Sequence, residues 1–105
     1  MSTKIMYLRD VNRKPFGCVA MAADHETKQV KYQFSVLHPN DTFEKELAKK
    51  IATGRLLKKP HNVSFAGETS HDIIKAVMQD LSSEACTSAR ARESATNWLQ
   101  APYNE

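Results

Sequence analysis

The sequence predicts an α+β fold, in which a three-stranded antiparallel β-meander is followed by two or three α-helices. Three observations carry this prediction. Apolar runs in the first third are separated by turn-forming residues, segment 30–36 alternates with a period of two, and apolar residues beyond residue 42 recur every three or four positions. A chain of 105 residues, 41% of them hydrophobic, suffices for one core. We expect a single domain over 1–101 and a frayed tail over 102–105.

The expected strands are separated by polar turns and cover residues 4–9, 16–22 and 30–36. One face of the third strand carries its apolar side chains, Val30, Tyr32, Phe34 and Val36. We expect this face to be buried against the first helix, through Phe43, Leu47 and Ile51. The opposite, polar face of the sheet would then remain available to solvent or to a partner.

The first expected helix covers residues 42–59. Asp41 and Glu44, three residues apart, form a capping box at its start. The segment 61–68 that follows is expected to be a loop or a short extended piece.

A second capping box, Thr69 with Asp72, begins a helical pattern that continues to about residue 100. One long helix and two shorter ones both fit this pattern. We favour a break at Ser82–Ser83, because the Ser-Ser-Glu sequence is a suitable new N-terminus.

Residue types that carry catalysis or bind cofactors are not grouped in this sequence. None of the histidines stands at a metal-ligand spacing from a Cys or an acidic residue; they are His25, His38, His61 and His71. With three glycines in all, neither a phosphate-binding loop nor a dinucleotide fingerprint can be built. We therefore expect a protein that is not an enzyme, with no catalytic residue, no cofactor and no metal.

The cysteines and the N-terminus indicate the compartment. Cys18 and Cys86 are too few for a disulfide framework and are expected to be small buried or half-buried apolar residues. No stretch approaches the roughly 18 apolar residues of a membrane span, and residues 1–5 lack the apolar core of a signal peptide. We expect a cytoplasmic protein without a membrane partner.

A net charge of +3 permits an acidic macromolecular partner. Cations cluster at the first hairpin and in the latter half of the helix 42–59. The residues we expect to bind a partner are Tyr7, Arg9, Arg13, Lys14, Lys31, Lys45, Lys49, Arg55, Lys58 and Lys59. Trp98 joins them if it does not belong to the core.

Two resemblances bear on function. The order of a three-stranded meander and a helix, over Lys4 to Lys59, is similar to plant AP2-type and phage-integrase N-terminal DNA-binding domains, although their Trp and Arg pattern on the strands is missing. The segments Tyr7–Asp10, Phe16–Cys18 and Ile51–Leu56 resemble those of small accessory proteins encoded by tailed phages. This second resemblance implies a protein that acts on macromolecules in the host cytoplasm, as inhibitors of host defence complexes such as anti-CRISPR proteins do.

Two functions follow as hypotheses. In the first, which we favour, the chain is a small non-enzymatic modulator or inhibitor that contacts a larger host protein complex. In the second it is a nucleic-acid-binding module that uses the basic helix 42–59 and the first hairpin. The sequence leaves a homodimer open in either case.

Overall fold

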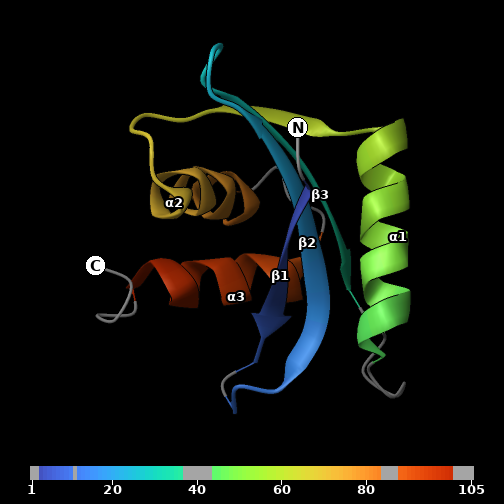
Figure 1. The fold of residues 1–105 in the computed structure, drawn as a ribbon. Helices are drawn as coiled ribbons and strands as arrows, with labels where there is room; N and C mark the ends of the chain where they lie inside the picture. Colours follow the sequence, from blue (N-terminus) through green and yellow to red (C-terminus); the bar gives the residue numbers. More distant parts are fainter. Residues whose placement is uncertain (1–2, 11, 37–43, 84–87, 101–105) are drawn as a thin grey trace.

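The computed structural model describes residues 3–10, 12–36, 44–83 and 88–100. The predicted α+β class is confirmed: an antiparallel sheet carries one helix on one face and two helices on the other (Figure 1). The predicted tail 102–105, like Asp41, Phe43, His38 and Cys86, lies outside the described residues.

The sheet has four strands in the order β1-β2-β3-β4, one more than the sequence predicted. The strands are β1 (Thr3–Arg9), β2 (Pro15–Asp24), β3 (Gln29–Val36) and β4 (His61–Ser64). The additional strand β4 comes from the segment predicted as a loop or extended piece. It pairs with the first half of β3, from Gln29 opposite Ser64 to Tyr32 opposite His61. The two edges of the sheet are therefore β1 and β4.

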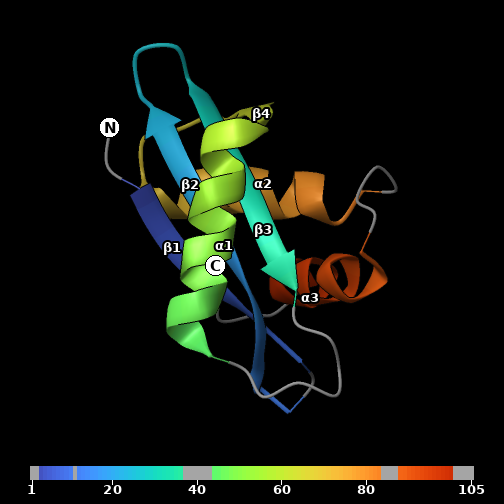
Figure 2. The same ribbon diagram turned by 90° about the vertical axis from the view of Figure 1, so that its right-hand side faces the viewer.

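The helices lie in two layers. Helix α1 (Lys45–Lys58) covers one face of the sheet, whereas α2 (Ser70–Leu81) and α3 (Ala89–Gln100) cover the other, as Figures 1 and 2 show. The predicted break is confirmed, because α2 ends at Leu81, but α3 begins at Ala89 and not at the Ser-Ser-Glu sequence. None of these helices is long and apolar enough to span a membrane.

The predicted capping box at the start of α2 is confirmed. The Thr69 side chain accepts a hydrogen bond from the backbone N–H of Asp72, and the Asp72 carboxylate accepts one from the backbone N–H of Thr69. The Thr69 hydroxyl also donates to this carboxylate, at 2.8 Å, and this bond, followed by the one from the backbone N–H of Thr69, holds the pKa of Asp72 below its usual range. Helix α1 has no such bond, since its N-cap residue Glu44 makes no side-chain cap.

The larger part of the core lies between the sheet and the helices α2 and α3. Its fully buried side chains include Leu8, Val19, Met21, Val30, Val77, Met78 and Leu81. Tyr32 belongs to it as well, and its hydroxyl donates a 2.5 Å hydrogen bond to the Asp80 carboxylate, which links β3 to α2.

The apolar face of β3 is turned away from α1, so the predicted packing against that helix is wrong. Val30 and Tyr32 are buried toward α2 and α3, and Phe34 and Val36 are half-buried on the same side. The predicted contact residues of α1 are solvent-exposed instead, Leu47 by 48% and Ile51 by 40%.

Helix α1 meets the sheet through small side chains. Ala48, Ala52 and Leu56 pack on Cys18 and Ala20 of β2. Alanines spaced by four residues form a narrow stripe that allows a close approach to a strand of small residues. The large side chains beside that stripe are therefore left at the rim.

The polar face of β3 is covered by α1, contrary to the expectation that it is available. Ser35 is buried, and its hydroxyl donates to the carbonyl oxygen of Ala48 at 3.0 Å. The Gln33 side chain donates to the carbonyl oxygen of Lys59 at 2.8 Å. The part of this face that carries Gln33 and Ser35 is therefore taken up by α1, whereas Lys31 stays exposed.

Candidate functional site

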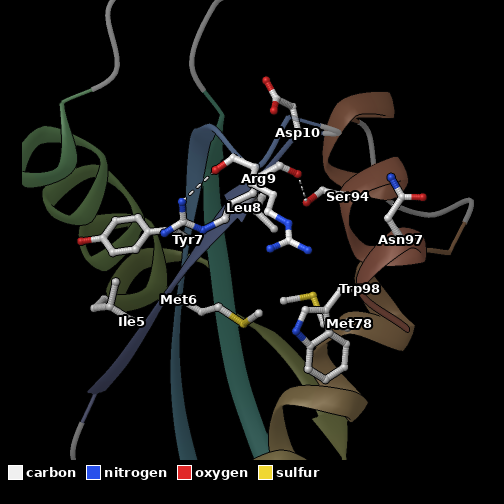
Figure 3. Close-up of a pocket in the computed structure, with 11 residues that line it drawn as sticks. Ile5, Met6, Tyr7, Leu8, Arg9, Asp10, Met78, Ser94, Asn97 and Trp98 are labelled. Carbon is white, nitrogen blue, oxygen red and sulfur yellow. Dashed lines mark hydrogen bonds between the residues drawn. The ribbon is translucent and has the colours of Figure 1, made fainter. Parts of the chain in front are cut away.

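A cavity of about 610 Å³ lies between the outer edge of β1 and the helix α3 (Figure 3). We call it the edge pocket. It is lined by Ile5, Met6, Tyr7, Leu8, Arg9, Asp10, Arg13, Met78, Ser94, Asn97 and Trp98.

The edge pocket runs along the strand edge. Consecutive side chains of a strand point to opposite faces, and here four consecutive residues, 5–8, line one cavity. A cavity that touches both faces of β1 has to lie over its edge. Within the described ranges, no strand pairs with this edge.

Apolar side chains from three elements form the floor. Met6 and Leu8 come from β1, Met78 from α2 and Trp98 from α3. Leu8 and Met78 are buried, whereas Met6 and Trp98 are half-buried and bridge the core to the surface. Trp98 therefore belongs both to the rim of the core and to the pocket, where Figure 3 shows it beside Met78.

The hairpin end of the pocket is basic. Arg9, Arg13 and Lys14 are exposed there. One guanidinium nitrogen of Arg9 donates to the carbonyl oxygen of Arg13 at 3.0 Å, which holds this side chain against the hairpin. Across the pocket, the Ser94 hydroxyl donates to the carbonyl oxygen of Arg9 at 3.0 Å and ties α3 to β1.

Asp10 places one negative charge beside the three cations Arg9, Arg13 and Lys14, and its carboxylate organises the turn. One carboxylate oxygen accepts the backbone N–H groups of Asn12, at 2.8 Å, and Lys14, at 3.0 Å. A carboxylate that accepts two backbone donors is fixed in place. The hairpin end therefore keeps a net positive charge.

Arg13 adopts a left-handed backbone conformation, with φ 63°. Glycine is the usual residue at this position of a hairpin, and a residue with a Cβ costs about 1–2 kcal/mol there. Non-glycine residues in strained conformations are concentrated at functional sites. The sequence retains an arginine where the fold alone favours glycine, which points to a use for its side chain.

We expect Arg13→Gly to raise the free energy of unfolding by about 0.5–1 kcal/mol, since relief of strain exceeds the added chain entropy of glycine. Urea denaturation measures this change. Lys28→Gly is the comparison at the second left-handed position: Lys28 has φ 57° and its ammonium donates to the Gly67 carbonyl at 2.7 Å, so loss of that bond should offset part of the gain. A loss of stability in Arg13→Gly would show that the fold needs the arginine side chain.

Comparison with known proteins adds no relative. No family model, no curated protein and no solved structure matches this chain.

The structure brings together only some of the predicted binding residues. Tyr7, Arg9 and Arg13 line the edge pocket, and Lys14 follows Arg13 in the same turn. The Lys45 ammonium lies 5.2 Å from the centre of the Tyr7 ring, so this residue of α1 borders the site.

The remaining cations lie elsewhere, and the basic residues of α1 do not form one face. Lys49 lies close enough to Cys18 on β2 to lower the pKa of its thiol. Arg55 points to β3 instead, where its guanidinium donates to the Phe34 carbonyl at 2.9 Å. Lys31 is exposed on β3, and Lys58 and Lys59 are exposed at the C-terminal end of α1.

The described residues hold no group of three or more His, Cys, Asp or Glu side chains that could bind a metal ion. Burial raises the pKa of the Cys18 thiol, and the nearby Lys49 only partly offsets this. A thiol shifted in this direction is a poor nucleophile at neutral pH, so Cys18 serves packing.

Sequence reasoning did not find the pocket's remaining lining residues. Met78 has the spacing of an ordinary core position, and Ser94 and Asn97 look like solvated polar residues. The sequence holds one local signal for Ser94 and Asn97: they are four and one residues before Trp98, and Ser94, Asn97 and Trp98 lie on one side of a helix.

Proposed function

We propose that this chain is a small non-enzymatic binding protein that acts by protein–protein contact through the edge pocket. One observation carries the proposal: the pocket gathers two aromatic residues, Tyr7 and Trp98, and two arginines, Arg9 and Arg13, around an apolar floor. Aromatic and Arg side chains dominate the binding energy of protein interfaces. The resemblance to phage accessory proteins supports a larger host complex as the target and modulation or inhibition as the outcome.

The composition of the floor fits a protein surface. The half-buried Met6, which lies over the buried core, has a flexible, polarisable thioether that adapts to apolar side chains of different shape. Exposed polar groups at the rim, such as those of Arg9 and Asn97, supply hydrogen bonds around this centre.

The alternative, binding of nucleic acid by the basic helix 42–59 and the first hairpin, has weaker support. Phosphate contacts require long cations along one face. In α1, Lys45 points to Tyr7 of β1 and Arg55 to β3, on different sides of the helix.

A salt titration separates the two functions. We expect labelled duplex and single-stranded DNA to bind poorly at physiological salt, and charge reversal at Lys49 and Arg55 to change little. Tight binding would favour the nucleic-acid function if a plot of the logarithm of the association constant against the logarithm of the salt concentration has a slope of roughly −0.7 to −0.9 per phosphate contacted.

A capture experiment from host-cell extract tests the pocket itself. We expect the double variant Arg9→Glu/Arg13→Glu to retain less than about a tenth of the captured partner, because each charged hydrogen bond contributes about 1.5–3 kcal/mol. Lys75→Glu, an exposed charge reversal on α2, is the control and should capture normally. Equal capture by the double variant and the control would contradict a role for the edge pocket.

A further inference from the structure

We propose that the edge pocket binds an extended peptide segment of the partner, which joins the sheet as a fifth strand beside β1. The segment carries apolar side chains on alternate positions and an acidic side chain at the hairpin end. This inference rests on the proposed function and specifies the shape and chemistry of the partner.

The backbone of β1 provides the first argument. An edge strand presents half of its N–H and C=O groups outward, and an extended peptide can bond to them. β1 is seven residues long, and the pocket lies over its edge along residues 5–8. The outward carbonyl of Arg9 is already bonded by Ser94, so addition would occupy the part of the strand before it.

The other edge of the sheet is less suited to strand addition. β4 has only four residues. Beyond β4, the outer edge of β3 is occupied by α1, whose Arg55 donates to the Phe34 carbonyl. β4 therefore serves as an internal control.

The two sides of β1 define the side-chain pattern. Figure 3 shows Ile5 and Tyr7 on the side of the strand nearer α1, and Met6, Met78 and Trp98 on the side of α2 and α3. An added strand places its alternate side chains on these same two sides. The positions facing Trp98 therefore require apolar residues with a period of two.

Charge selects the acidic residue and disfavours a second copy of this chain as the occupant. Arg9, Arg13 and Lys14 are exposed at one end of β1, and Lys4 is exposed near the other. Antiparallel pairing of β1 with its own copy would bring Lys4 toward Arg9, a like-charge pair that is destabilising across strands. A segment with a Glu or Asp at the hairpin end complements the same cations.

A selection with a displayed library of random twelve-residue peptides tests the inference on the full chain. We expect the enriched peptides to share apolar residues at every second position and an acidic residue near one end. Arg9→Glu/Arg13→Glu should weaken the best peptide about tenfold or more, and Lys75→Glu should not. Two N-methylated versions of the peptide should differ. Methylation of the alternate amides that face β1 should abolish binding, whereas methylation of the other set, which faces away from β1, should not.

Amide hydrogen exchange supplies the second readout. The best peptide should slow exchange at alternate residues of β1 and leave β4 unchanged. Enriched peptides with a helical spacing of three and four, no enrichment at all, or unchanged exchange in β1 would each overturn strand addition. So would a dimer in sedimentation whose β1 amides are protected without peptide, since a second copy would then occupy the edge. If β1 stays unprotected while partner capture still requires Arg9 and Arg13, strand addition fails and the proposed function stands.

Discussion

Replacing Leu81 with Ala is expected to lower the free energy of unfolding by about 2–5 kcal/mol. Leu81 is 0% exposed and ends α2 inside the core that the sheet shares with α2 and α3. The substitution removes three side-chain carbons and leaves a cavity that neighbours such as Met78 fill only in part. In a domain whose stability is about 5–15 kcal/mol, this loss shifts the midpoint of urea denaturation strongly.

Leu57→Ala is the matched control, since the same atoms are removed from a side chain that is 82% exposed on α1. We expect its free energy of unfolding to stay within about 0.5 kcal/mol of the unsubstituted protein. Similar losses in the two variants would contradict the assignment of the main core to the α2–α3 side.

Replacing Gly17 with Ala is expected to destabilise the protein by about 3 kcal/mol, the upper range for overpacking. A Cβ at this position of β2 would lie 2.5 Å from the carbonyl oxygen of Ser35 and 3.3 Å from a methyl carbon of Leu8. The nearer atom belongs to the backbone of β3, so relief requires displacement of a paired strand. Thermal or urea denaturation measures the loss.

Gly54→Ala is the matched control, since the same substitution is expected to stabilise the protein at this position. A Cβ at Gly54 meets nothing within 4 Å, and alanine is favoured over glycine inside a helix. Its free energy of unfolding should rise by about 1 kcal/mol. If both glycine substitutions had the same sign, close packing between β2 and β3 would not explain the effect at Gly17.

The fold class was predictable because its signals are local. The alternation around Tyr32 sorts the side chains of β3 onto two faces, and the Thr69–Asp72 pair marks the start of α2 wherever the helix packs. Which helix covers which face of the sheet depends on packing between elements that are distant in the sequence. The prediction gave the apolar face of β3 to the large residues of α1, whereas that helix packs through Ala48 and Ala52.

Strand β4 was missed because it is short and half exposed. Its four residues have no alternation, and only its pairing with the first half of β3 makes it a strand. Three of the eleven residues that line the candidate site were foreseen from residue type alone, since Tyr7, Arg9 and Arg13 are clustered aromatic and basic residues in one hairpin. Met78 and Ser94 could not be assigned, because they reach the pocket only through the packing of α2 and α3.

The hydrogen bond between Ser94 and the Arg9 carbonyl joins residues 85 positions apart, and it closes the pocket between the first strand and the last helix described. A domain generally folds as a unit, so α3 docks on β1 together with the burial of the core that the sheet shares with α2 and α3. The wall that carries Trp98 arrives only when α3 docks on β1. The pocket is therefore complete only in the fully folded domain, and a partner that uses both the strand edge and Trp98 would not recognise a chain without α3.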